Sequence, residues 1–186
     1  MKLEEKTLKS ESIYEGRVLH ACVDDVQLPN GENAKREYIK HVGAVCVLPL
    51  TDEGEVVLEK QYRYPFHDVL IEIPAGKLDS KQEDPRKAAI RELREETGAE
   101  ARELIYLGDY YPSPAILDEK IRMYLARGLS FGEQHTDEDE FLEVFRMPFA
   151  DLVKEVLAGN IPDGKTQVAT LRVAALLKEE QHETEL

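Results

Sequence analysis

Three glutamates lie close together in the segment RELREETG, residues 91–98: they are Glu92, Glu95 and Glu96. Like charges at this spacing repel one another on a helix unless a cation lies among them. Carboxylates at positions i, i+3 and i+4 can converge on hard divalent cations such as Mg²⁺ or Mn²⁺. Taken alone, an acidic helix face is most often only solvated. The segment therefore raises the hypothesis of a metal site.

A helix over residues 85–97 is predicted to carry these glutamates. Asp84 is a good N-cap, Pro85 suits the first helical position, and Gly98 suits the stop. On a helical wheel the glutamates share one arc, and the opposite arc is mainly apolar. Arg91 lies beside the acidic arc and could pair with a neighbouring glutamate, which would fix its rotamer. One face is thus expected to pack and the other to present carboxylates.

The composition excludes several classes of partner. The chain has 186 residues, enough for one buried core, and its net charge of −14 repels nucleic acid. No apolar run approaches the roughly 20 residues of a membrane span, and residues 1–12 lack the character of a signal peptide. The expected location is therefore the cytoplasm. Cys22 and Cys46 lie in alternating apolar segments and are expected to be buried thiols.

The elements that must position the glutamates are mostly strands. Residues 12–41 alternate around Asn30-Gly31, a strong hairpin signal, and predict a small antiparallel sheet. The nearly all-apolar segment 43–50 is typical of a strand covered on both faces. Five more strands and two amphipathic helices follow from β-branched content and helical spacing. The strands are 55–64, 68–76, 103–111, 119–129 and 141–148, and the helices are 149–159 and 165–181. The pattern predicts an α/β domain with a mixed sheet, preceded by an N-terminal antiparallel β module.

The residues around the glutamates resemble the Nudix box. That pattern is Gly, five residues, Glu, seven residues, then Arg-Glu-apolar-any-Glu-Glu-any-Gly-apolar, and here it runs from Gly76 to Ala99. Six residues separate Gly76 from Glu83 in this chain, so Gln82 stands at the family spacing and Glu83 one beyond it. The extra residue falls in a predicted loop, where insertions are tolerated. The helix glutamates stay in register with the pattern.

The resemblance implies a fold and a metal. Residues 43–186 would form the Nudix domain, an α/β/α sandwich with a mixed sheet, and residues 1–42 an N-terminal module. In the family this module commonly swaps across a two-fold homodimer. The implied metal is Mg²⁺, with Mn²⁺ as a substitute, and the chemistry of oxygen ligands agrees with both. Five ligands are implied: the carbonyl of Ala75 and the carboxylates of Glu92, Glu95, Glu96 and Glu140.

The resemblance to bacterial ADP-ribose pyrophosphatases extends beyond the box, over the N-terminal hairpin module and four further segments. These segments are KREYIKHVGAV, IEIPAGKLD, YYPSPAILDEK and a late GKT turn. In that subfamily a proline 16 residues after the last glycine of the box marks ADP-ribose hydrolases, and Pro114 lies 16 residues after Gly98. The usual Ser-Pro-Gly is here Ser113-Pro114-Ala115. The implied reaction is Mg²⁺-dependent hydrolysis of ADP-ribose to AMP and ribose 5-phosphate. Another nucleoside diphosphate sugar, such as GDP-mannose or ADP-glucose, stays open as the substrate.

The resemblance also implies roles for single residues. Three catalytic residues are implied: Glu138, Arg91 and Glu95. Glu138, in the acidic segment 135–144, would deprotonate the attacking water, and it could exchange roles with the metal ligand Glu140. Four substrate-binding residues are implied: Arg36, Arg63, Pro114 and Glu119. In a swapped dimer, Arg36 would serve the site of the partner.

Other motifs fit less well. Residues 159–166, GNIPDGKT, satisfy a phosphate-binding loop pattern, but such a loop leaves a strand and the preceding segment has helical character. We therefore expect a helix stop at Gly159 and a turn at 162–164. Neither acidic segment has the glycine and alternating oxygens of an EF-hand loop. The five histidines are scattered and are expected to be surface or structural residues.

Overall fold

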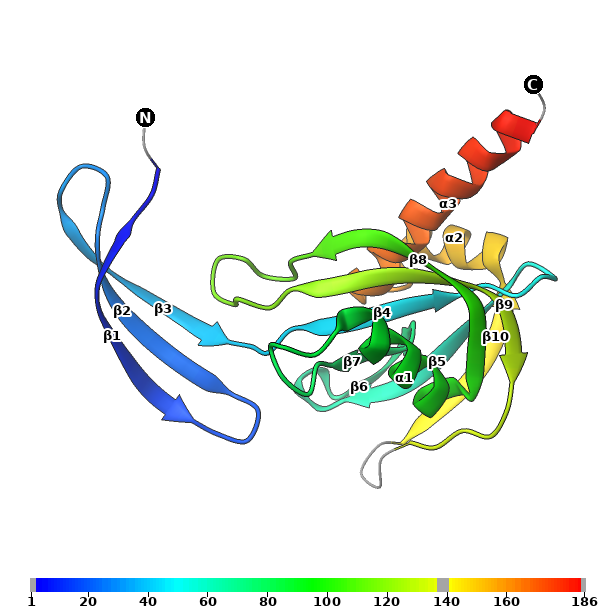
Figure 1. Ribbon diagram of the computed structural model, residues 1–186, viewed down its shortest axis with the longest axis horizontal. Coiled ribbons are helices and arrows are strands. Elements are labelled where there is room, and N and C mark those ends of the chain that lie inside the picture. Colours follow the sequence, from blue (N-terminus) through cyan, green and yellow to red (C-terminus); the bar gives the residue numbers. More distant parts are fainter. Residues whose placement is uncertain (1–2, 137–140, 185–186) are drawn as a thin grey trace.

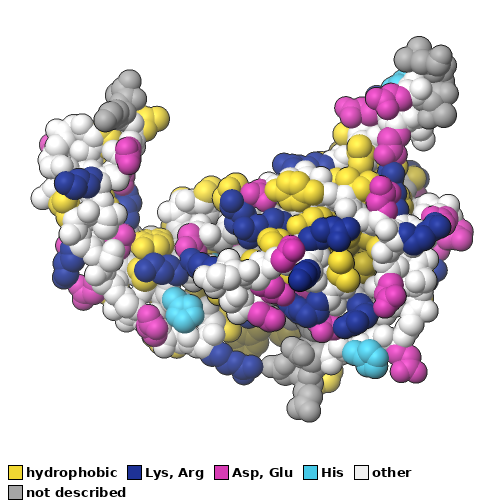
Figure 2. All heavy atoms as spheres, viewed as in Figure 1, with side chains coloured by type: hydrophobic (Ala, Val, Ile, Leu, Met, Phe, Trp, Pro, Cys, Tyr) yellow, Lys and Arg dark blue, Asp and Glu magenta, His cyan; other side chains and the backbone are white. Residues whose placement is uncertain are grey.

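The computed structural model describes residues 3–136 and 141–184, and it forms an N-terminal sheet and a larger body (Figure 1). The N-terminal sheet has the strand order β1-β2-β3, and all its neighbours are antiparallel. Its strands are β1 (Lys6–Glu15), β2 (His20–Gln27) and β3 (Asn33–Lys40). The sheet projects from one end of the body, as the space-filling view also shows (Figure 2), and Ile39 in β3 makes backbone hydrogen bonds to the segment 116–118.

The body contains two sheets. The first has the order β7-β4-β9-β8 and is mixed, because β4 runs parallel to β9 while the other pairs are antiparallel. Its strands are β4 (Ala44–Pro49), β7 (Ala75–Lys77), β8 (Ala99–Tyr110) and β9 (Ile121–Phe131). The second sheet is antiparallel, with the order β10-β5-β6. Its strands are β5 (Glu55–Arg63), β6 (Asp68–Glu72) and β10 (Leu142–Pro148).

The core lies on both faces of β4. Cys46 and Leu48 point into a cluster shared with the second sheet and two C-terminal helices, whereas Val45 and Val47 point toward the glutamate-bearing helix. This two-sided burial explains the apolar run of the strand. The helices are α1 (Pro85–Thr97), α2 (Phe149–Ala158) and α3 (Gly164–Thr184). Helices on both faces of a mixed sheet confirm the predicted α/β/α arrangement.

Helix α1 begins and ends where the sequence predicts. The side chain of Asp84 accepts the backbone N–H of Arg86 at 2.9 Å, and Pro85 occupies the first turn. At the other end Gly98 adopts φ 69°, and its N–H donates to the carbonyl of Arg94 at 2.8 Å. Because the left-handed conformation suits glycine, the helix stops there. These caps fix the two ends of α1, and its buried residues Ala88, Ala89 and Leu93 pack against the sheet.

The predicted strand 68–76 is two strands rather than one. Strand β6 pairs with β5 in the second sheet, and β7 pairs with β4 in the first. Pro74 lies between them and has no N–H to continue a ladder, so the chain changes sheet at this point. The carbonyl of Pro74 still accepts the N–H of Val47 at 2.9 Å. The break brings the start of β7 beside α1.

The remaining elements differ from prediction mainly at their ends. The strand expected to begin at residue 103 begins at Ala99, and the last helix extends to Thr184 rather than to residue 181. Gly159 ends α2, which confirms the expected helix stop. Because a helix and not a strand precedes residues 159–166, they do not form a phosphate-binding loop of the strand–loop–helix kind. Among the described residues, none of the helices is long and apolar enough to cross a membrane.

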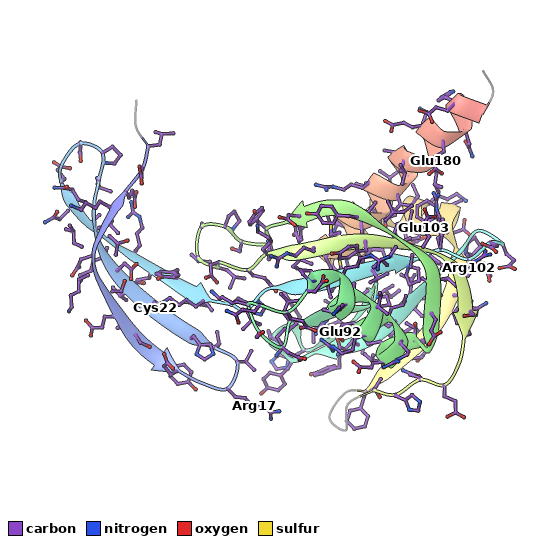
Figure 3. All side chains as sticks on the ribbon, viewed as in Figure 1. Arg17, Cys22, Glu92, Arg102, Glu103 and Glu180 are labelled. Carbon is purple, nitrogen blue, oxygen red and sulfur yellow. The ribbon has the colours of Figure 1, made fainter. Side chains whose placement is uncertain are left out.

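The N-terminal sheet has one strand more than the predicted hairpin. Strands β2 and β3 surround Asn30-Gly31 as expected, but β1 was not predicted, because every residue in it is exposed and it has no apolar face. Cys22 in β2 and Cys46 in β4 are buried free thiols, as expected. Figure 3 labels Cys22 in this sheet and Glu92 within the body.

Candidate active site

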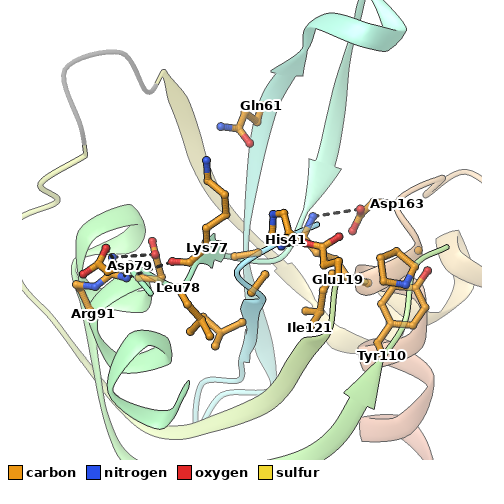
Figure 4. Close-up of a pocket in the computed structure, with 18 of the residues that line it drawn as sticks. His41, Gln61, Lys77, Leu78, Asp79, Arg91, Tyr110, Glu119, Ile121 and Asp163 are labelled. Carbon is orange, nitrogen blue, oxygen red and sulfur yellow. Dashed lines mark hydrogen bonds and ion pairs between the residues drawn. The ribbon is translucent and has the colours of Figure 1, made fainter. Parts of the chain in front are cut away.

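A cavity of about 870 Å³ opens on the body where α1, the start of β7 and the start of α3 approach one another. Arg91 and Asp79 lie at one side of it and Asp163 at the other, with His41 and Glu119 between them (Figure 4). The cavity therefore has one end formed by the acidic helix and an opposite end formed by residues of β5 and of the start of α3.

At the acidic end, β7 passes directly along the glutamates of α1. The backbone N–H of Ala75 donates to the carboxylate of Glu96 at 2.8 Å. A Cβ added to Gly76 would lie 2.0 Å from the carboxyl carbon of Glu92. Glu92 and Glu96 are buried, at 9% and 2% exposure. Only glycine leaves room for Glu92, which explains the first position of the motif.

Arg91 joins the glutamates to the loop before the helix. Its Nη1 donates to Glu92 at 2.8 Å and to Glu95 at 3.1 Å, and its Nη2 lies 3.6 Å from Glu83. Burial lowers the pKa of Arg91, but the carboxylates of Glu92 and Glu95 raise it by more, so the guanidinium stays charged. Glu83 also accepts the N–H of Asp79 at 2.6 Å. Glu83 therefore reaches Arg91 despite the extra residue, which the loop absorbs.

The opposite end holds a buried chain of charges. Arg63 donates through Nε and Nη2 to the two carboxylate oxygens of Glu72, at 2.6 and 2.7 Å. Glu72 is 1% exposed and also contacts Nζ of Lys165, which lies 3.1 Å from a carboxylate oxygen of Asp163. Arg63 remains 37% exposed toward the cavity, so it can still contact a ligand.

His41 and Glu119 line the middle of the cavity. Nδ1 of His41 lies 3.5 Å from a carboxylate oxygen of Glu119 and accepts the N–H of Gly43 at 3.1 Å. The backbone N–H of His41 donates to Asp118 at 2.5 Å. His41 thus belongs to the cavity wall, a place that its isolated position in the sequence did not reveal.

Two family models match this chain. Residues 40–169 match the NUDIX domain, and residues 5–39 match the nucleoside diphosphate sugar hydrolase N-terminal domain. The chain belongs to the Nudix family. The glutamates of α1 with Gly76 and Arg91 are therefore the Nudix box of this hydrolase, and the recognition made from the sequence is confirmed.

Relatives of this Nudix hydrolase match it over most of its length. It is 46% identical over 169 residues to the ADP-ribose pyrophosphatase of Bacillus subtilis, covering 90% of this chain and 91% of that one. It is 45% identical over 168 residues to the methanol dehydrogenase activator of Bacillus methanolicus, covering 89% and 90%. A crystal structure of an ADP compounds hydrolase superposes with a TM-score of 0.84 at 24% identity, covering 97% and 98%, and supports the fold.

The residues of this Nudix box fit a divalent metal ion, the cofactor that the family generally uses. Their donors are oxygens, which hard divalent cations prefer, and two buried carboxylates one helical turn apart are stabilised by a cation. Among the described residues, no group of three or more His, Cys, Asp or Glu is gathered as a metal cluster. Arg91 and the N–H of Ala75 engage these carboxylates instead. Glu138 and Glu140 lie outside the described residues.

The other predicted substrate residues are divided between the cavity and the surface. Arg63 and Glu119 line the cavity of this Nudix domain. Arg36 lies on the N-terminal sheet, where its Nε donates to Glu5 at 2.8 Å, and it is not among the described residues that line the cavity. Pro114 is exposed on the loop between β8 and β9 and is likewise outside that lining.

Glu72 is expected to make the stability of this Nudix domain depend on pH. Burial raises its pKa, but the hydrogen bonds from Arg63 and the charge of Lys165 lower it by more, so the net pKa is below the ordinary 4.5. A carboxyl with a depressed pKa stabilises the fold above its unfolded pKa, and this contribution is lost as pH falls through the folded pKa. We expect Glu72→Gln to flatten the loss of unfolding free energy between about pH 5 and pH 3.

Urea unfolding at a series of pH values measures this effect. Glu53, an exposed residue of the turn before β5, provides the control Glu53→Gln. The control should keep the pH slope of the wild type. An unchanged slope in Glu72→Gln would show that Glu72 does not carry the predicted linkage.

Proposed function

We propose that this protein hydrolyses the pyrophosphate bond of ADP-ribose to AMP and ribose 5-phosphate with Mg²⁺, for which Mn²⁺ can substitute. One observation carries the proposal: a single cavity places the Nudix glutamates at one end and Arg63 at the other. A pyrophosphate between them could contact both a metal ion held by the glutamates and the guanidinium of Arg63. The 46% identity to a bacterial ADP-ribose pyrophosphatase supports this choice of substrate.

Ala75, Glu92 and Glu96 are the proposed metal ligands, with Glu95 sharing the site and Glu140 completing it. A bound divalent ion lowers the pKa of water and offsets the charge of the phosphates. Arg91 holds Glu92 and Glu95 in place through its Nη1. Glu138 is proposed as the base that accepts the proton of the attacking water, and it could exchange roles with Glu140.

Substrate binding is proposed to use the opposite end and the middle of the cavity. Glu72 holds the guanidinium of Arg63 in a bidentate ion pair, which leaves its remaining donors for a phosphate. The carboxylate of Glu119 would accept hydrogen bonds from the hydroxyl groups of the terminal ribose. Pro114 would shape the loop that reaches this sugar.

A homodimer with swapped N-terminal modules is part of the proposal. The N-terminal sheet exposes apolar side chains on and between β1 and β2, and a small sheet needs a packing partner to be stable. These side chains are Leu8, Ile13, Tyr14, Val18 and Leu19. Residues 1–42 would then dimerise and place Arg36 in the site of the partner, while residues 43–186 form the hydrolase domain. The cytoplasmic location stays a prediction.

A panel of substrates tests the proposal against its alternative, another nucleoside diphosphate sugar. We expect kcat/KM with Mg²⁺ to be highest for ADP-ribose among ADP-ribose, ADP-glucose, GDP-mannose, NADH and ATP. A higher value for GDP-mannose or ADP-glucose would retain the pyrophosphatase and replace the substrate. Cleavage of none of them would favour a role other than hydrolysis of these substrates and would contradict the proposal.

A further inference from the structure

The start of α3 contacts the point where the chain passes from β6 to β7. Asp163 caps the helix, because its carboxylate accepts the N–H of Thr166 at 2.9 Å and the hydroxyl of Thr166 at 2.6 Å. The same hydroxyl oxygen accepts the backbone N–H of Ile73 at 2.9 Å. Thr166 is fully buried, at 0% exposure. The hydroxyl therefore joins the cap of α3 to the chain beside β7.

This bond replaces a sheet bond where the ladder stops. Ile73 lies after the last residue of β6, and Pro74 has no N–H, so β-sheet pairing is interrupted here. Two residues after Ile73, the N–H of Ala75 binds Glu96. A change in the position of Ile73 would therefore shift Ala75 and Gly76 against the metal-binding glutamates, where a Cβ already has no room.

Lys165 contacts the same segment one residue earlier, at Glu72, the last residue of β6. Its ammonium contacts Glu72 and Asp163, and it is 9% exposed. Burial lowers the pKa of Lys165, but Asp163 and Glu72 raise it by more, so it stays charged. Charges then alternate from Asp163 through Lys165 and Glu72 to Arg63. Such a chain holds the carboxylate of Glu72 in one orientation, and Glu72 in turn orients Arg63.

We propose that Lys165 and Thr166 are positioning residues of the active site. Lys165 orients Arg63 for the substrate through Glu72, and Thr166 holds Ala75 against the metal-binding glutamates through the N–H of Ile73. The inference rests on the proposed function for the roles of Arg63 and Ala75. It also assigns a role to the GKT sequence, which resembles a phosphate-binding loop but forms the first turn of α3.

Substitutions of Lys165 test its proposed role in orienting Arg63. Lys165→Met keeps most of the length of the side chain and removes the charge, and we expect it to raise the KM for ADP-ribose about tenfold while kcat falls less than about threefold. Lys165→Arg should restore the KM to within about threefold of the wild type. Binding of ADP-ribose in EDTA, measured by calorimetry, should weaken in parallel in Lys165→Met.

Arg127→Met is the matched control for Lys165→Met. Arg127 also makes a bidentate ion pair, with Glu180 at 3.0 and 2.8 Å, but it does not line the cavity. This variant should keep the KM and the calorimetric affinity of the wild type. If Lys165→Met lowers only the melting temperature and leaves the KM and the calorimetric affinity unchanged, the role of Lys165 is structural and it does not orient Arg63 for the substrate.

Substitution of Thr166 tests its proposed role in holding Ala75, with a measurement that does not require substrate hydrolysis. Thr166→Val removes the hydroxyl at constant shape, and we expect the affinity for Mn²⁺, measured by electron paramagnetic resonance, to fall about tenfold. Thr170→Val is the control, because Thr170 is also buried one turn later and its hydroxyl has no hydrogen-bond partner among the described residues. Its affinity for Mn²⁺ should not change.

The two failures can be told apart. Equal Mn²⁺ affinities in Thr166→Val and the wild type would overturn the proposed role of Thr166 in positioning Ala75, whatever substrate the enzyme hydrolyses. If the wild type does not cleave ADP-ribose, the proposed function fails, while the Mn²⁺ comparison still decides the role of Thr166.

Discussion

Glu96→Gln is expected to lower kcat for ADP-ribose by about three orders of magnitude, or roughly 4 kcal/mol of transition-state stabilisation. Glu96 is 2% exposed and accepts the N–H of Ala75 at 2.8 Å. The amide oxygen of glutamine can still accept this bond, so the fold should remain. The amide has no negative charge, however, and it would turn an NH₂ group toward the metal. Activity should therefore be lost without unfolding.

The rate of AMP release measures this loss, and Mn²⁺ binding and urea unfolding show its origin. Glu53→Gln, an equal change at an exposed turn, should keep the rate of the wild type. Glu96→Gln should bind Mn²⁺ weakly while its unfolding midpoint stays close to that of the wild type. A rate near that of the wild type would remove Glu96 from the metal site.

Gly76→Ala is expected to lower kcat/KM by at least about a hundredfold through a steric effect at the same site. The added methyl group would lie 2.0 Å from the carboxyl carbon of Glu92 and 2.1 and 2.3 Å from its oxygens. Either Glu92 must leave its position or β7 must move away from α1, which would also shift Ala75. Overpacking of this kind costs about 1–3 kcal/mol of stability.

Gly54→Ala separates the loss of activity from the loss of stability. Gly54 has φ +82°, so alanine is strained there, but a Cβ at this position meets nothing within 4 Å. We expect this control to lose about 1 kcal/mol of stability and to keep its activity. If Gly76→Ala were as active as Gly54→Ala, the contact between Gly76 and Glu92 would not matter for catalysis.

The acidic half of the site could be predicted from the sequence because its signals are local. Asp84, Pro85 and Gly98 define the two ends of the helix, and the spacing of the glutamates within it defines their shared face. The motif also includes Gly76, although its steric reason is visible only from the packing of Glu92. Capping and periodicity were sufficient to place the glutamates on one face of a helix, and the resemblance to the Nudix box supplied their expected role.

In the opposite half the resemblance implied Arg63, but the contacts that hold it could not be predicted, because they join distant segments. Ile73 and Thr166 are 93 residues apart, as are Glu72 and Lys165, and no periodic pattern connects them. The sequence around Lys165 instead suggested a phosphate-binding loop or a plain turn. Strand β1 was missed for a different reason: all of its residues are exposed, so alternation could not mark it.

The most direct test of the central claim is a metal titration of the purified, metal-stripped protein with ADP-ribose as substrate. AMP and ribose 5-phosphate would be quantified by chromatography as Mg²⁺ is added. We predict no products without metal, and equal amounts of both products that increase with Mg²⁺ until the site is saturated. Equal turnover in the presence of a chelator, or no cleavage at any concentration of Mg²⁺ or Mn²⁺, would contradict the assignment of this cavity as a metal-dependent pyrophosphatase site.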